Sequence, residues 1–227
     1  MLATQHHKKF KVVTTAALFG LFACGVWAGG SDTTAKSDEL NQAAQTMQQM
    51  TSSTEIPKTL MDQANCIGVI PKLTKGGFIA GAEHGSGVVS CRTGNGWSAP
   101  AFFSISGGSV GFQAGLENSQ IVLLMNDKGK QYVMNDNFQL GAEAVAAGPT
   151  SGTSGSVGWK APILSYAKSK GAYAGVNLAG STIKLDNDSI HKVYGSDVSA
   201  EQVLNASVQP PADARPFISA LPATHGM

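Results

Sequence analysis

The sequence lacks a strong net charge, because it carries 16 Lys and Arg against 15 Asp and Glu. Three of these 16, Lys8, Lys9 and Lys11, lie in a predicted N-terminal leader, which leaves 13 after its removal. A nearly neutral, slightly acidic protein has no general field that attracts nucleic acid. We therefore expect no nucleic-acid partner, and any attraction to an anionic lipid surface must come from local groups of lysines.

The motifs of common cofactor and metal sites are also missing. No P-loop occurs, and no GxGxxG stands between a predicted strand and a predicted helix. No CxxC occurs, and no histidine lies at the spacing of a zinc ligand. The acidic segment 186–188 lacks the glycine and the distal glutamate of a calcium loop, which favours a solvated turn and helix cap. We therefore expect neither a cofactor nor a metal.

Cysteine is scarce, with three residues in the chain. Cys24 lies in the leader, so Cys66 and Cys91 remain as a pair at the edges of two predicted strands. In an oxidising compartment this pair is expected to form a cross-strand disulfide. On the chain-entropy model such a bond stabilises by about 3–4 kcal/mol. The alternative is two buried free thiols.

The N-terminus has the pattern of an export signal. A positively charged segment precedes an apolar run over residues 12–23, which is shorter than the roughly 20 residues of a membrane span. A transmembrane anchor is the alternative. Two processing sites compete: cleavage after Ala28, which makes residues 1–28 a signal peptide, and a lipobox that ends at Cys24 and would acylate it. Residues 29–36 then form a tether, and we expect an exported protein, periplasmic or lipid-anchored to an envelope membrane.

Glycine is abundant, at 27 of 227 residues, against a usual share of about 7%. Between residues 65 and 115 it separates short apolar runs rich in Val, Ile and Phe, which predicts successive short strands rather than helices. The expected fold class is α+β: mainly antiparallel Gly-rich sheets, sandwich or barrel-like, with short helices at the N- and C-terminal ends. One aromatic layer is expected from Phe78, Trp97, Phe102, Phe103 and Phe112.

Apolar spacing predicts the remaining elements. A helix over 37–52 has one apolar face and a Gln- and Thr-rich face without Lys or Arg, which favours packing on the core over membrane binding. Residues 120–125 should form a central strand. Further helices are expected at 57–64, 189–194 and 200–205, further strands at 138–148, 162–168, 172–178 and 182–185, and a loop at 150–158. Residues 126–135 form either a helix capped by Asn126, which is favoured, or a hairpin closed at Gly129. The folded domain should cover 37–209, followed by a Pro-rich tail over 210–227 that docks briefly at Phe217 and Ile218 and then frays.

Two groups of side chains are candidates for function. Gly107 to Gly111 reads GxSxG, the pattern of a hydrolase nucleophile elbow at Ser109, but a strand rather than a helix is predicted after it. Glu83 and Glu143 are strand carboxylates that nothing in the sequence pairs. Lysines near two turns could bind an anionic bilayer, although lysines also keep strand edges soluble. These candidate lipid-binding residues are Lys72, Lys75, Lys160, Lys168 and Lys170.

Several segments, in order, resemble the SYLF domain family. The match begins near residue 56 with IPKTLMDQANCIGVIPKLTKGGFIAG, includes the specific string GGSVGFQAG, and ends at VYG near residue 195. This family is the lipid-binding and actin-regulator domain of eukaryotes and has many exported bacterial members. The resemblance implies a non-catalytic lipid-binding domain that uses basic residues and an N-terminal amphipathic helix in membrane contact.

The sequence departs from the family where an Arg often follows the GP motif, because Pro149 is followed by Thr150. An exported bacterial protein would also rarely meet phosphoinositides or actin. The expected partner is therefore a phospholipid or membrane surface, and not actin. The expected function is non-enzymatic phospholipid binding in the bacterial envelope. The alternatives are a structural envelope protein that acts through protein contacts, and a serine hydrolase that uses Ser109.

Overall fold

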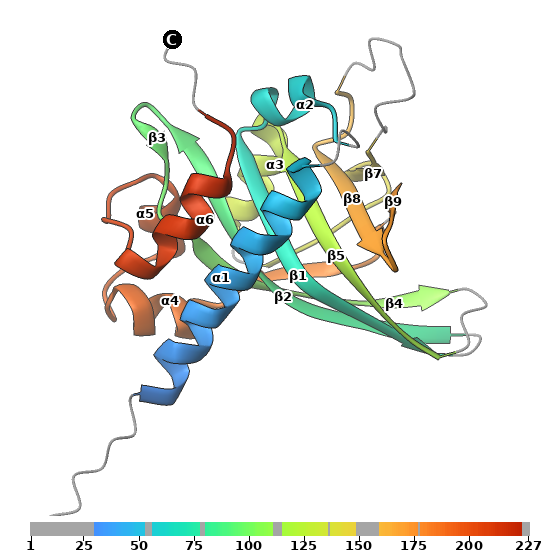
Figure 1. Cartoon of the computed structure of the whole chain (residues 1–227), viewed down its shortest axis with the longest axis horizontal. Coiled ribbons are helices and arrows are strands. Elements are labelled where there is room, and N and C mark those ends of the chain that lie inside the picture. The colour runs from blue at the N-terminus through green and yellow to red at the C-terminus, as the bar shows by residue number, and fades with distance from the viewer. Residues whose placement is uncertain are drawn as a thin grey trace, which may run out of the picture.

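In the part of the chain that the structure describes, ten strands form one curled sheet with helices packed on it (Figure 1). The computed structural model describes residues 30–52, 56–77, 80–110, 115–135, 137–148, 159–176 and 178–223. The expectations for the leader and tether residue 29, for Cys24, Phe78 and Phe112, for the loop 150–158 and for residues 224–227 lie outside this range. The α+β class, with helices at both ends of the chain, is confirmed.

The helices are α1 (Gly30–Ser52), α2 (Lys58–Gln63), α3 (Asp127–Met134), α4 (Asn187–Tyr194), α5 (Ala200–Leu204), the short 3₁₀ helix η1 (Ala212–Ala214) and α6 (Arg215–Ala220). The strands are β1 (Cys66–Gly77), β2 (Ala80–Thr93), β3 (Gly96–Trp97), β4 (Ala101–Val110), β5 (Gly115–Met125), β6 (Asn137–Gln139), β7 (Val145–Ala147), β8 (Ile163–Ser169), β9 (Ala172–Gly175) and β10 (Thr182–Leu185).

The strands follow the order β6-β10-β4-β2-β1-β5-β8-β7, with β3 paired to β2 and β9 to β8. This order confirms a central position for β5. The sheet is mainly antiparallel, as expected, but β7 runs parallel to β8. Parallel neighbours need a connection of a dozen or more residues, and the segment between Ala147 and Ile163 is long enough to provide it. The sheet is therefore mixed.

The expected short strands merge into longer ones. Four strands are long: β1, β2, β4 and β5 contain 12, 14, 10 and 11 residues. In Figure 1 these strands extend past the helices toward the right of the view. Glycines lie within these strands rather than only between them. At Gly85 an added Cβ would lie 2.9 Å from the carbonyl oxygen of Lys72, and at Gly87 it would lie 3.0 Å from the ring of Phe103. Glycine here permits a close approach of the neighbouring strands β1 and β4.

The prediction of a single aromatic layer is wrong. Phe102 and Phe103 are consecutive in β4, so their side chains point to opposite faces of the sheet. Both are buried, with 0% and 2% of their surfaces exposed. The sheet is thus covered on both faces in this region, by the helices on one side and by its own curl on the other.

Helix α1 crosses one face of the sheet, with α6 beside it (Figure 1). It begins at Gly30, so residues 30–36, expected as a tether, are its first turns. Its apolar side chains are buried, which confirms that this face packs on the core: Leu40, Ala43, Ala44, Met47 and Met50. The longer helix is explained in part by Lys36, which makes ion pairs with Glu39 and with Asp186.

The Pro-rich segment after residue 209 is part of the folded domain as far as residue 223. Phe217 of α6 is fully buried, and the Trp97 indole N–H donates a 2.8 Å hydrogen bond to the carbonyl oxygen of Pro222. Near the other end of the segment, the Ser37 hydroxyl donates to the Asp213 carboxylate. Pro216 fits the first turn of α6, where its missing N–H costs no hydrogen bond.

The region 138–148 also differs from the single strand expected for it. It forms β6 and β7, which lie at opposite ends of the sheet and are separated by a turn that begins at Gly141. The helices and strands expected at 126–135, 162–168, 172–178, 182–185, 189–194 and 200–205 are present, some with shifted ends. Asn126 caps α3 by accepting a hydrogen bond from the Gly129 N–H, as its residue type suggests.

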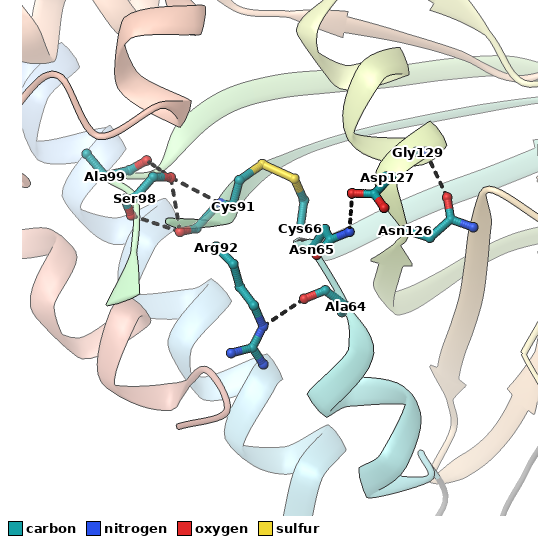
Figure 2. The surroundings of a disulfide bond; sticks show 11 residues. Ala64, Asn65, Cys66, Cys91, Arg92, Ser98, Ala99, Asn126, Asp127 and Gly129 are labelled. Atoms are coloured by element: carbon teal, nitrogen blue, oxygen red, sulfur yellow. Dashed lines mark hydrogen bonds between the residues drawn. A yellow bond between two sulfur atoms is a disulfide. The ribbon is translucent and has the colours of Figure 1, made fainter. Parts of the chain in front are cut away.

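Cys66 and Cys91 form the expected disulfide (Figure 2). They are direct partners in the β1–β2 pairing, at the start of β1 and near the end of β2. Hydrogen bonds surround the bond: Asn65 donates to Asp127 at 2.6 Å, and the Arg92 Nε donates to the Ala64 carbonyl oxygen at 2.8 Å. The disulfide therefore closes the junction of α2, β1, β2 and α3.

Replacing both cysteines with alanine should lower the free energy of unfolding by about 3–4 kcal/mol, because the unfolded chain loses the closed loop. Chemical denaturation with and without a reductant measures this. The wild type should lose stability in reductant, whereas the double variant should not respond. An equal response of the two proteins to reductant would contradict the prediction.

Gly87→Ala should lower the free energy of unfolding by about 1–3 kcal/mol, because the new methyl group collides with the Val69 carbonyl oxygen and the Phe103 ring. Gly94→Ala is the matched control, since an added Cβ there meets nothing within 4 Å, and it should change stability by less than about 0.5 kcal/mol. Urea denaturation of both variants is the measurement, and equal midpoints would refute the close approach.

Candidate functional site

The structure does not bring the predicted lipid-binding lysines to one surface. Lys72 and Lys75 are three residues apart in β1, so their side chains leave opposite faces of the sheet. Lys168 lies on β8 with its ammonium 4.9 Å from the centre of the Tyr173 ring, and Lys170 lies in the β8–β9 turn at positive φ. Lys160 precedes β8 and is exposed.

Lys75 has a structural role instead. Its ammonium lies 2.7 Å from the Glu83 carboxylate, whose side chain is only 3% exposed. The Ser181 hydroxyl donates a hydrogen bond to the other oxygen of the same carboxylate. Glu83, which no sequence pattern paired, is the direct cross-strand partner of Lys75. A buried charge needs such partners, so this lysine is not available to a ligand.

The opposite face of the sheet carries two cross-strand rows of polar side chains, which we call the polar face. Direct partners in antiparallel strands lie on the same face, and the register connects each residue to the next. All of these side chains are exposed or partly exposed. The first row is Asn137, Lys184, Ser104, Ser86 and Lys72. The second row is Gln139, Thr182, Ser106, His84, Thr74 and Asn118.

Neither row of the polar face contains an acidic residue. Among the described residues, no carboxylate lies within ion-pair distance of Lys72 or Lys184. The sequence pointed to Lys72 but not to the rest, because the members of a row come from segments up to 112 residues apart, the separation of Lys72 and Lys184. The alternation within single strands was the only available signal.

A cleft of about 300 Å³ lies where the first turns of α1 meet the polar face. Its lining residues are Ala35, Lys36, Glu39, Gln42, Pro71, Lys72 and Ser86. Pro71 falls where the register of β1 shifts against both of its neighbours. A proline cannot donate to a strand partner, so a bulge is a position that tolerates it. The bulge places Pro71 and Lys72 at the wall of the cleft.

The charges on the α1 side of the cleft are paired with one another. Lys36 lies 2.8 Å from Glu39 and 3.3 Å from Asp186, and 5.0 Å from the centre of the Phe102 ring. Burial opposes its charge, but the two carboxylates outweigh burial and raise the pKa of the Lys36 ammonium. Burial likewise opposes the charge of Asp186, but hydrogen bonds from Ser189 and the charge of Lys36 lower the pKa of its carboxyl. Lys36 and Asp186 are therefore both charged at neutral pH.

Ser109 lies within β4, where it pairs with Gly81 of β2. The next described element is the strand β5, whereas a nucleophile elbow needs a sharp turn into a helix. The GxSxG pattern therefore lacks the structural context of a hydrolase. Among the described residues, no group of His, Cys, Asp and Glu could hold a metal ion.

In the described part of the chain, no helix is long and apolar enough to cross a bilayer. Taken together, these features define an α+β domain with an exposed polar sheet face and a lysine-lined cleft.

Comparison with known proteins identifies the family. The family model described as "Ysc84: Las17-binding protein actin regulator" matches residues 106–224. The chain belongs to this family, which is the SYLF domain family that its sequence motifs resemble. The match includes α6, in agreement with the packing of that helix on the domain.

Full-length relatives are similar over most of this chain. It is 34% identical over 175 residues to SH3 domain-containing protein PJ696.02 of Schizosaccharomyces pombe, with 73% of this chain and 40% of the relative covered. It is 32% identical over 175 residues to LAS seventeen-binding protein 3 of Saccharomyces cerevisiae, with 73% and 38% covered. It is 32% identical over 190 residues to SH3 domain-containing YSC84-like protein 1 of Mus musculus, with 78% and 56% covered. The chain thus spans about half or less of the length of these relatives.

Glu83→Gln should lower the free energy of unfolding by about 3 kcal/mol, because it leaves the Lys75 ammonium without its buried counter-charge. Lys58→Gln is the control: its ion pair with Asp62 has the lysine side chain 73% exposed, and exposed pairs contribute about 0–1 kcal/mol. Adding Lys75→Met to Glu83→Gln should restore part of the loss. Urea denaturation measures all three, and a Glu83→Gln variant as stable as Lys58→Gln would contradict a structural role for the pair.

Proposed function

We propose that this chain is a non-enzymatic phospholipid-binding protein of a bacterial cell envelope. The observation that carries the proposal is the polar face, where Lys72 and Lys184 are exposed and have no acidic residue in either row. Lysines near an anionic bilayer surface contribute about 1 kcal/mol each. The hydroxyl side chains between the two lysines, those of Ser86 and Ser104, suit a hydrated headgroup layer rather than the hydrocarbon interior.

The expected location at a membrane supports the same function. The N-terminal pattern of an export signal ends near Cys24, and α1 begins six residues later at Gly30. Six residues of extended chain span at most about 20 Å. An acyl chain on Cys24 would therefore hold the first turns of α1, and with them the cleft beside the polar face, close to the membrane surface.

A second candidate function is the binding of a protein partner. The family description names Las17 binding and actin regulation, and one relative is named as a LAS seventeen-binding protein. Export would separate this chain from actin, so the partner in this case would be another envelope protein. The chain would then serve as a structural component of the envelope.

The purified chain should co-sediment with vesicles that contain anionic phospholipid, and less with vesicles of phosphatidylcholine alone. Binding should weaken between 0.1 M and 1 M salt, because the screening length falls from about 10 Å to about 3 Å. Failure to bind either kind of vesicle at low salt would refute phospholipid binding. Crosslinking to an envelope protein without lipid binding would support the second candidate.

A further inference from the structure

We propose that the cleft between α1 and the β1 bulge binds the phosphate group of a phospholipid, with Lys72 and Ser86 as its contacts. This inference rests on the proposed function and assigns it a site. It also separates Lys72 from the other lysines that the sequence suggested. The volume of the cleft, about 300 Å³, is at the lower end of the roughly 300–1,000 Å³ of small-molecule sites.

The two contact residues are held side by side by the sheet. Lys72 and Ser86 are direct partners across β1 and β2, and the side chains of such partners are about 5 Å apart at Cβ. Both are exposed, and both line the cleft. One supplies an ammonium and the other a hydroxyl, so together they can donate hydrogen bonds to two oxygens of one phosphate. Hydrogen bonds between an ammonium and an anionic oxygen are about twice as strong as neutral ones.

The charged side chains on the α1 wall of the cleft are paired with each other. Among the described residues that line the cleft, Lys72 is therefore the one charge without an ion pair. The Glu39 carboxylate is directed to Lys36, at 2.8 Å, and Asp186 binds the same lysine from outside the cleft. These pairs fix the first turns of α1 above the sheet. Gln42 adds an amide to the lining. An anion is therefore the charge that the cleft complements.

The other candidate surfaces fit a phosphate less well. Lys168 is stacked on Tyr173, and Lys75 is paired with buried Glu83. A groove between α3 and α5 contains Lys130 together with the acidic residues Asp127 and Glu201, so its balance of charge is negative. The polar face, in contrast, continues from the cleft across further strands that are about 4.8 Å apart. A headgroup layer can lie along it while one phosphate enters the cleft.

Variants of the full chain test the site with vesicles of phosphatidylglycerol and phosphatidylethanolamine. Lys72→Gln should weaken vesicle binding about fivefold, the equivalent of the roughly 1 kcal/mol of one lysine at a membrane. Ser86→Leu should also weaken binding, because it removes the hydroxyl and fills the cleft without a change in net charge. Lys72→Arg should retain binding. Lys130→Gln and Lys170→Gln remove the same charge elsewhere and should change binding less than twofold.

The outcomes separate the site from the function. If the wild type binds and both Lys72→Gln and Ser86→Leu bind equally well, the cleft is not the site, although phospholipid binding stands. If all lysine variants lose the same affinity and Ser86→Leu loses none, the attraction is diffuse and the site is again refuted. If the wild type binds no vesicle, the proposed function itself fails. Thermal unfolding of each variant shows that a loss of binding is not a loss of folding.

Soluble glycerol 3-phosphate distinguishes a lipid from a free phosphate compound. Titration calorimetry should show much weaker binding of the soluble compound than of vesicles, because one phosphate lacks the headgroup layer that covers the polar face. Binding of glycerol 3-phosphate that requires Lys72 and is at least as tight as vesicle binding would overturn the assignment to a phospholipid. It would instead identify a soluble phosphate compound as the ligand.

Discussion

The close approach of strands and side chains at glycine is the constraint on which the rest of the structure depends. At Gly87 a methyl group would collide with the neighbouring strand and with the ring of Phe103. Because the side chain is absent, the long strands can curl and bury one face of the sheet on itself. The other face of the sheet is covered by α1 near one end of the strands. Beyond α1, this face is exposed to solvent.

The placement of α1 follows from this division. Its apolar side chains are buried in the core. An ion pair between Lys36 and Asp186, the N-cap residue of α4, connects the first turns of α1 to that helix. Helix α1 therefore forms one wall of the cleft. The family resemblance implied a different role, that of an amphipathic helix in contact with a membrane. The polar side of α1 and the bulge at Pro71 meet over the start of the polar face.

Cross-strand register decides the roles of two lysines that look equivalent in the sequence. Lys75 faces the inside of the curl, where it pairs with the Glu83 carboxylate, which also accepts a hydrogen bond from the Ser181 hydroxyl. Lys72 faces outward beside Ser86 and forms no ion pair with a carboxylate among the described residues. A shift of one residue in β1 would exchange them. The function that we propose therefore depends on which face of the sheet each lysine side chain leaves, as much as on the presence of lysine.

The sequence by itself determined the α+β class, the family, the central strand at 120–125 and the pairing of Cys66 with Cys91, and it favoured the helix at Asn126. The strand and the helix follow from apolar spacing and a capping residue within a few positions, whereas the class, the family and the cysteine pair follow from patterns that run along the chain. Only the tertiary structure decided the parallel β7–β8 pair, the docking of α6, the Lys75–Glu83 pair and the rows of the polar face. Those features join segments that are distant in the chain, and their contacts depend on register and curl, which local patterns do not encode.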